Sequence, residues 1–230
     1  MKLFCISDLH GKLDGLDPSG CDLVIIAGDF AKMTGWGKWH MYDMKKWIEN
    51  KFIPFTQQYK MPFVIVPGNH DLIFDSRRTL NISDISYSIN WPENVYILID
   101  KQIEINGLKI YGTPWVPIIS YSWAFEAEHD ILQEKFSKIP ENLDILITHS
   151  PPRIANEAVD FSIQTNRGPF GSNELSQAIF EKQPKYMFCG HIHSGNHDLV
   201  KFNETSIYNV SRLDENYEIA YKPRIIEIFN

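Results

Sequence analysis

Cysteine is scarce in this sequence, and no Cys-x-x-Cys pair occurs. The three cysteines are Cys5, Cys21 and Cys189. Without paired spacing, a zinc cluster built on thiolates is not expected, and a chain of 230 residues buries enough apolar surface to fold without disulfides. Cys5 and Cys189 lie inside apolar runs, where a thiol packs as a small apolar side chain. We therefore expect reduced thiols and a cytoplasmic protein.

Long apolar runs and an excess of basic residues are also missing. No stretch reaches the roughly 18–20 apolar residues that span a bilayer, and the first apolar run ends at Ser7 without the features of a signal peptide. The formal net charge is −7, from 22 Lys and Arg against 29 Asp and Glu. This balance argues against a general nucleic-acid-binding surface, although not against a local basic pocket. Because no repeat or linker interrupts the sequence, we expect residues 1–230 to form one domain.

What the sequence does contain is a polar cluster directly after each of five short apolar runs. Apolar runs of this length, partly β-branched, predict buried strands. In an open α/β sheet, ligands bind outside the carboxyl ends of the strands. We therefore expect the clusters to meet at one site. The runs and clusters are Leu3–Ile6 before Ser7-Asp8-Leu9-His10, Leu23–Ala27 before Gly28-Asp29, Phe63–Val66 before Pro67-Gly68-Asn69-His70-Asp71, Leu143–Thr148 before His149, and Tyr186–Cys189 before Gly190-His191-Ile192-His193.

The order of the predicted elements favours an α/β fold. Strand, helix and strand alternate up to Asp71, which indicates a parallel sheet. Asn106-Gly107 between two strand-like runs predicts a hairpin. We expect a layered α/β sandwich of two mixed β-sheets flanked by helices. The other predicted elements are helices over Lys38–Asn50, Trp123–Ile139 and Asn173–Glu181, the last capped by Ser172, a loop or short helix over 75–91, and strands over Val95–Ile99, Lys101–Ile105, Leu108–Tyr111, Thr205–Val210 and Arg224–Ile228.

The residue types in the five clusters suit a pair of metal ions. Imidazole and carboxylate ligands bind divalent Mn, Fe, Ni or Zn, and only two of the candidates carry a charge. One ion would have too many ligands, whereas two ions sharing a carboxylate would each have about four and keep a net charge of about +2, which attracts a phosphate ester. His40, His129 and His197 fit no part of this pattern. The candidates are Asp8, His10, Asp29, Asn69, His149, His191 and His193.

In this order, DxH, GD, GNHD, H and GHxH, the motifs resemble those of the calcineurin-like metallophosphoesterase superfamily. A narrower resemblance is to its metallophosphoesterase-domain-containing branch, relatives of the class III cyclic-nucleotide phosphodiesterases. That likeness rests on Tyr111-Gly112-Thr113-Pro114-Trp115, on Trp123-Ala124-Phe125, and on the run from Ile139 to His149 with Pro151-Pro152 after it.

The superfamily resemblance implies a role for each ligand. Asp8, His10 and His193 would hold the first metal, Asp29 would bridge, and Asn69, His149 and His191 would hold the second. A hydroxide bridging two divalent metals, with manganese favoured, would attack phosphorus. Asn69 would contact the phosphoryl oxygens and protonated His70 would serve as the catalytic acid. The sequence departs from the protein phosphatases at Lys32, where they have the aspartate that orients this histidine.

The predicted substrate is a small phosphodiester, a cyclic nucleotide or similar. Trp115 is a candidate to stack on a base, and Arg167 a candidate to bind a phosphate through its two-pronged guanidinium. No membrane partner is expected, and the oligomeric state is left open. Three alternatives stay open: a nuclease acting on DNA or RNA ends, a phosphomonoesterase, and a catalytically silent metal-binding scaffold for protein interactions.

Overall fold

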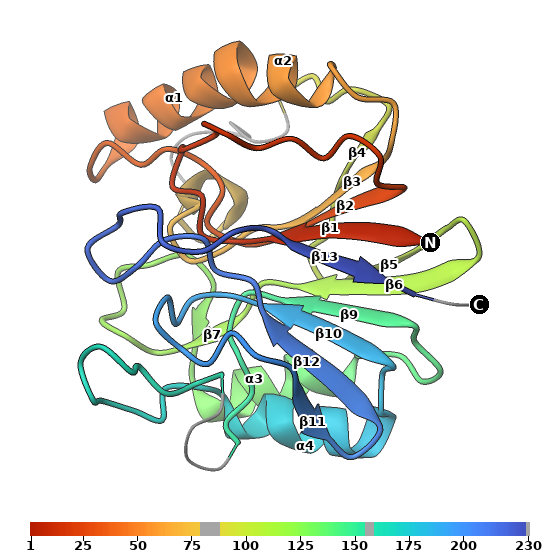
Figure 1. The fold of residues 1–230 in the computed structure, drawn as a ribbon. Helices are drawn as coiled ribbons and strands as arrows, with labels where there is room; N and C mark the ends of the chain where they lie inside the picture. The colour runs from red at the N-terminus through yellow and green to blue at the C-terminus, as the bar shows by residue number, and fades with distance from the viewer. Residues whose placement is uncertain (79–87, 155–158, 229–230) are drawn as a thin grey trace.

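Two β-sheets packed against each other form the centre of the protein (Figure 1). The structure is a computed structural model and describes residues 1–78, 88–154 and 159–228. The first sheet has the strand order β13-β1-β2-β3-β4, and β1 to β4 are parallel whereas β13 is antiparallel to β1. Its strands are β1 (Lys2–Ile6), β2 (Leu23–Ala27), β3 (Phe63–Val66), β4 (Val95–Ile97) and β13 (Arg224–Glu227).

The second sheet is also mixed, with the order β11-β12-β10-β9-β6-β5. Its four inner strands are parallel, and the two edge strands β5 and β11 are antiparallel to their neighbours. A short parallel pair, β7 and β8, lies apart from both sheets. The strands are β5 (Lys101–Ile105), β6 (Leu108–Thr113), β7 (Val116–Pro117), β8 (Glu126–Ala127), β9 (Ile145–Thr148), β10 (Tyr186–Cys189), β11 (Val200–Phe202) and β12 (Thr205–Asn209).

Helices cover the outer face of each sheet, so the layers run helix, sheet, sheet, helix (Figure 1). One continuous helical segment, composed of three pieces, covers the first sheet, and a pair of helices covers the second. A short 3₁₀ helix follows β3. The helices are α1 (Lys38–Trp47), the π-helical turn η1 (Ile48–Phe52), α2 (Ile53–Thr56), the 3₁₀ helix η2 (Leu72–Phe74), α3 (His129–Ser137) and α4 (Asn173–Lys182).

Apolar side chains that point alternately to the two faces of each strand explain this layering. Leu3 and Cys5 of β1 pack between the two sheets, with Ile145 and Phe188 of the second sheet. The intervening Phe4 joins the core beneath the helices. Successive side chains of a strand point to opposite faces, so strands that are apolar on both faces require cover on both. The predicted layered sandwich of two mixed sheets is confirmed.

Two predicted helices differ from the observed ones. The first continues past Asn50 through a π turn to Thr56. The other begins only at His129, because Phe125 has a positive φ of 56° and Glu126 belongs to β8. The Glu126 carboxylate accepts hydrogen bonds from three backbone N–H groups of the preceding loop, which stabilises a turn in place of a helix. Of the predicted segment 75–91, residues 79–87 lie outside the described part of the chain.

Candidate metal centre

The five polar clusters do converge at one edge of the molecule. Asp8 and His10 follow β1, Asp29 follows β2, and the GNHD segment follows β3, while His149 and the His191–His193 segment follow β9 and β10. The loops that follow these strands lie on the left in Figure 1. The segment after β12 ties the two sheets together here, since Ser7 N–H donates to the carbonyl of Val210 and Arg212 N–H donates to that of Ser7.

Close packing at this edge requires glycine. At Gly28 φ is +99°, and an added Cβ would lie 2.1 Å from His149 Nδ1. At Gly190 an added Cβ would lie 2.3 Å from Asp8 Oδ2. Both distances are too short for any side chain, so the two glycines make room for the ligand residues that the sequence predicts. Close approach of backbone to a site is an ordinary use of glycine.

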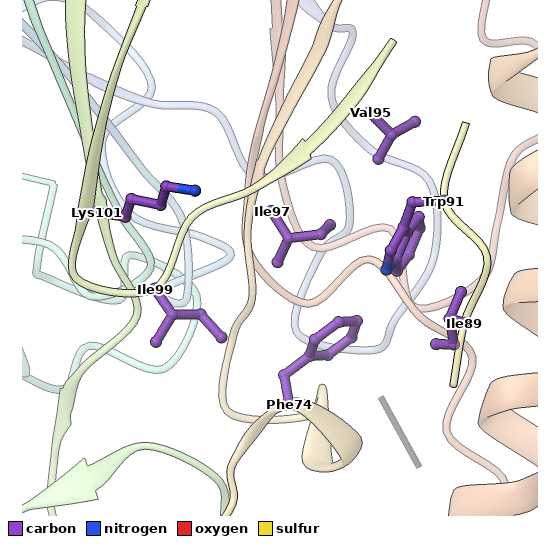
Figure 2. A pocket seen from close by; sticks show the side chains of 7 residues that line it. All are labelled: Phe74, Ile89, Trp91, Val95, Ile97, Ile99 and Lys101. Carbon is purple, nitrogen blue, oxygen red and sulfur yellow. The ribbon is translucent and has the colours of Figure 1, made fainter. Parts of the chain in front are cut away.

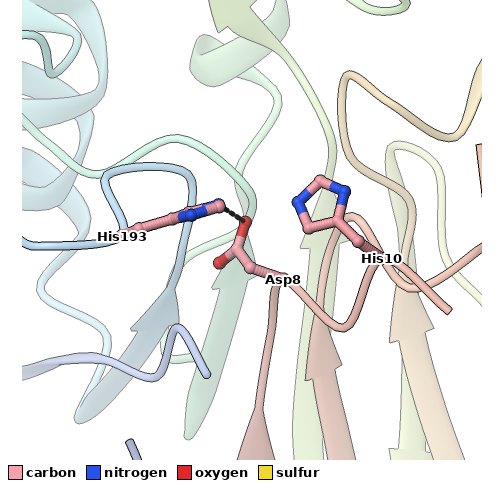
Figure 3. Close-up of side chains that lie close together, drawn as sticks. All are labelled: Asp8, His10 and His193. Carbon is pink, nitrogen blue, oxygen red and sulfur yellow. Dashed lines mark ion pairs between the residues drawn. The ribbon is translucent and has the colours of Figure 1, made fainter. Parts of the chain in front are cut away.

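Asp8, His10 and His193 form one group of metal-binding side chains (Figure 3). Asp8 is fully buried and lies between the two imidazoles, with Oδ1 3.4 Å from His193 Nε2. Ser7 Oγ donates to Asp8 Oδ2 at 2.5 Å, and the His191 N–H also donates to this carboxylate. These donors hold the Asp8 carboxylate in a single orientation.

Asp29 has a more central position than any other ligand candidate among the described residues. Its Oδ2 lies 3.2 Å from His149 Nε2, 3.7 Å from His10 Nε2 and 4.0 Å from His70 Nε2. Its Oδ1 is used differently, since it accepts the backbone N–H of His70 at 2.7 Å. One carboxylate oxygen surrounded by three ring nitrogens is an arrangement that suits a cation between them.

Backbone carbonyls orient two of the imidazoles. His149 Nδ1 lies 3.0 Å from the carbonyl oxygen of Ala27, and His193 Nδ1 lies 2.9 Å from that of Asp214. A carbonyl only accepts, so each Nδ1 carries the proton and donates it, which leaves Nε2 directed at a carboxylate. Metal-binding histidines usually make such a bond through the nitrogen that does not bind the metal.

The charges at this edge are strongly coupled. Burial opposes the ionisation of Asp8 and Asp29, but the neighbouring histidines outweigh it and hold the pKa of each carboxyl below its usual range. Burial likewise opposes the positive charge of His149 and His193. Asp29 and Asp8 nevertheless raise the pKa of each imidazole to about 9. Both imidazoles are therefore protonated at neutral pH without a metal, and a cation would replace these protons.

The residues fit a divalent cation on grounds of chemistry and burial. His10 Nε2 is buried and has no hydrogen-bond partner, and an unpaired buried polar atom of this kind is costly. Burial lowers the pKa of His10 to about 4, so its imidazole is neutral at neutral pH and one of its ring nitrogens has a free lone pair. Three groups of carboxylate and imidazole atoms lie close enough to bind an ion: Asp8, His10 and His193; His10, Asp29 and His70; and Asp8, Asp29 and His149.

Two predicted ligands lie in the cluster but outside those groups. Asn69 Oδ1 lies 2.9 Å from His149 Nε2. The ring of His191 lies 5.0 Å from that of His149, centroid to centroid. Burial and the nearby charge of His149 lower the pKa of His191 to about 3, so its ring is neutral, as a ligand requires.

His70 is positioned by aromatic rings. Its ring lies 4.1 Å from that of Trp123 and meets the ring of His10 edge-on at 4.7 Å. The Asp71 carboxylate accepts the backbone N–H groups of Gly68, Phe30 and Ala31. Lys32 stands where the protein phosphatases have an orienting aspartate, and the ring of Trp123 packs against the His70 imidazole instead.

A cavity of about 260 Å³ opens onto these groups. Tyr217 belongs to its wall, with its ring 4.8 Å from that of His10 and 5.3 Å from that of His193. Sequence reasoning does not find Tyr217, since it lies in a polar stretch with no motif. It also places Trp123 in a helix. The cavity is lined by Asp29, Asn69, His70, Ile119, Trp123, His191, His193, Glu215 and Tyr217.

Of the three predicted substrate contacts, Asn69 lines this cavity, whereas Trp115 and Arg167 do not. Trp115 is buried, and its Nε1 donates to both carboxylate oxygens of Asp100 at 2.9 Å. Arg77 and Lys135 lie over its ring at 4.7 and 4.3 Å. Arg167 is exposed, and its carbonyl accepts the N–H of Ser162. Neither residue lines the cavity.

Another cavity, of about 450 Å³, lies beside β4 (Figure 2). Its wall is mainly apolar, with Phe74 and Trp91 among its residues, and contains none of the predicted ligands. Within the three described ranges of the chain, no helix is long and apolar enough to cross a membrane.

Comparisons with known proteins agree on one family. A family model described as calcineurin-like phosphoesterase matches residues 1–195. Metallophosphoesterase domain-containing protein 1 of Homo sapiens is 30% identical over 246 residues, which cover 99% of this chain and 71% of that protein. A UPF0046 protein of Caenorhabditis elegans is 30% identical over 241 residues, which cover 99% of this chain and 81% of that protein.

Solved structures share the fold. The phosphopantetheinyl hydrolase of Mycobacterium tuberculosis is similar with a TM-score of 0.58 at 15% identity, over 91% of this chain and 88% of that one. The TT1561 protein of Thermus thermophilus has a TM-score of 0.59 at 12% identity, over 90% and 88% of the two chains. At these identities the likeness concerns the fold alone.

Proposed function

This chain belongs to the calcineurin-like phosphoesterase family, and on that premise we propose that it hydrolyses a small phosphodiester at a pair of divalent metal ions. The predicted family resemblance is thereby confirmed, and with it a metal-dependent phosphoesterase. The observation that carries the finer proposal is the surroundings of Asp29 Oδ2, with three imidazole nitrogens within 4.0 Å.

In the proposed centre, Asp29 is shared between two sets of ligands. Asp8, His10 and His193 form one set; Asn69, His149 and His191 form the other. Bound there, divalent ions supply the positive charge that lowers the pKa of a water from about 15.7 towards about 7 and stabilises the charge that develops on the phosphoryl oxygens. We take manganese as the first ion to test, since the ligands are carboxylate, amide and imidazole groups.

The chain's own residues position the ester and move a proton. Asn69 and His70 line the cavity and lie where the phosphoryl group would bind. Burial lowers the pKa of His70, so its imidazole is protonated in only a minor fraction of the protein molecules at neutral pH. In those molecules His70 donates a proton from Nε2 to the leaving oxygen. General acid catalysis of this kind typically raises the rate about 10²–10⁴-fold.

The shape and charge of the site favour a small ester. The cavity is about 260 Å³, and Trp123 and Tyr217 narrow it. The net charge of −7 opposes long polyanions. A phosphodiester of nucleotide size therefore suits the site better than a nucleic acid does.

The direct test uses two substrates with the same chromophore. The manganese-loaded protein should cleave bis(p-nitrophenyl) phosphate faster than p-nitrophenyl phosphate, and removal of the metal by a chelator should abolish both activities. Asp29→Asn should lose metal and activity together. Asp130→Asn, in the first turn of α3 and exposed, should keep both.

Four results would contradict the proposal or a part of it. Cleavage of the monoester alone would make the protein a phosphomonoesterase, and a strong preference for DNA or RNA ends would make it a nuclease. Purified protein with well under two ions per chain and no hydrolysis would favour an interaction scaffold instead. Full activity in Asp29→Asn would exclude the shared carboxylate.

A further inference from the structure

A second cavity adjoins the metal centre. It measures about 430 Å³ and shares Ile119 and His191 with the cavity of about 260 Å³ at the metal centre. Ile119 and Phe170 are half exposed, at 50% and 43%, so these apolar side chains face open space rather than a packed core. The lining residues are Pro117, Ile118, Ile119, Phe170, His191 and Ile192.

The backbone of this wall offers few free N–H donors to a ligand. The Ile119 N–H donates to Glu126 Oε1, the Phe170 N–H to the carbonyl of Asp160, and the Ile192 N–H to the carbonyl of Gly190. Pro117 has no N–H. His191 is the sole lining residue with a titratable side chain. Such a wall recognises hydrocarbon or an aromatic ring, because sugar hydroxyls and base edges would lose their bonds to water without replacement.

We propose that this cavity binds an apolar alkyl or aryl group of the phosphodiester, namely the group that stays on phosphorus. The inference rests on the proposed function. His70, which protonates the leaving oxygen, lines the metal cavity and not this one, so the leaving group belongs on the other side. His191 and Ile119 join the two cavities, and an ester bound at the metal ions would therefore extend its second group over Ile119 towards Phe170. The preferred substrates are then mixed diesters with an apolar group rather than cyclic nucleotides.

Binding of inert phosphonates tests the cavity without turnover. Calorimetry with the manganese-loaded protein should find phenylphosphonate about 10–100-fold tighter than methylphosphonate, the gain expected for burying a ring. Ile119→Ser and Phe170→Ser should reduce this preference to a few-fold. Ile163→Ser is the matched control, since Ile163 is 63% exposed in the same loop region but does not line the cavity, and it should keep the preference.

Two diesters with one leaving group test the same idea in catalysis. Phenyl p-nitrophenyl phosphate should exceed methyl p-nitrophenyl phosphate in kcat/KM by at least about tenfold, and the two cavity variants should remove that ratio. Equal rates for the two diesters, or a phenyl preference unchanged in Phe170→Ser, would overturn the inference and leave the diesterase proposal standing. Hydrolysis of neither diester would overturn the proposed function, and the phosphonate affinities would still decide the cavity.

Discussion

Several ligand residues adopt a backbone conformation that is unfavourable for anything but glycine. Asp8, His10, Asp29 and His191 have φ of 53°, 43°, 51° and 71°. Each such residue costs on the order of 1–3 kcal/mol and persists where the surrounding structure holds it in place, which is typical of functional sites. Here hydrogen bonds to their carboxylates hold Asp8 and Asp29 in place.

The role of His70 can be tested through the leaving group. His70→Asn should lower the rate about 10²–10⁴-fold for diesters with an alkoxide leaving group, which needs a proton. With p-nitrophenolate, which leaves readily without one, the loss should be much smaller. Rates for a series of leaving groups measure the difference, and exposed His129→Asn serves as the control. An equal loss for all leaving groups would show that His70 acts in binding and not as an acid.

At the scale of elements, the turns after the strands decide where the ligands lie. The predicted strands over Leu23–Ala27, Phe63–Val66 and Tyr186–Cys189 are observed with those bounds. The prediction succeeds because these runs are apolar on both faces and end abruptly in Gly or Pro. The α4 helix also begins as predicted, with Ser172 Oγ accepting the N–H of Leu175. The segment 123–128 was predicted wrongly, since the hydrogen bonds from the backbone of residues 119–123 to the Glu126 carboxylate outweigh its helical pattern.

Glycine at the end of β2 gives the sharpest test at this scale. Gly28→Ala should lose metal, because its Cβ would lie 2.1 Å from His149 Nδ1 and displace that ring. Gly20→Ala is a matched control: its φ is also positive, at +79°, but nothing lies within 4 Å of the added Cβ. Metal content by elemental analysis should fall in the first variant alone. Equal metal content in both would mean that His149 is not a ligand.

For the whole molecule, the metal centre lies where the two sheets meet. Asp8 and Asp29 follow strands of the first sheet, whereas His149 and His193 follow strands of the second. Each carboxylate faces an imidazole from the other sheet, at 3.4 Å for Asp8 and 3.2 Å for Asp29. Ions bound here would link the sheets, so metal affinity and stability should rise and fall together.

The metal-free protein should lose stability as the pH rises from about 6.5 to about 9. His149 and His193 have folded pKa values of about 9, above the unfolded value of about 6.5. Their contribution is complete below the unfolded value and is lost as the pH rises through the folded one. Calorimetric Tm values with chelator should fall over this window. With manganese the decline should be smaller, because the ion replaces both protons. A flat profile without metal would contradict the assigned pairs.

The same linkage predicts proton release on metal binding. At pH 7 about two protons should leave per chain, those of His149 and His193. Calorimetric titration with manganese in buffers of different ionisation enthalpy measures this number. Release of none would mean that the ion displaces the proton of neither imidazole.

The sequence by itself determined the layers and the ligand types, because apolar periodicity and strand-end residues are local properties of the chain. It also predicted that Asp8, Asp29 and His149 meet at one site, since each directly follows the carboxyl end of a strand. Only the tertiary structure decided the walls of the site. Tyr217 reaches the metal cavity from a segment without a periodic pattern, and Trp123 reaches it from a loop where the sequence predicts a helix, whereas Trp115 and Arg167 do not line it. Such positions depend on how distant loops cross the two sheets, and no local pattern in the sequence encodes that crossing.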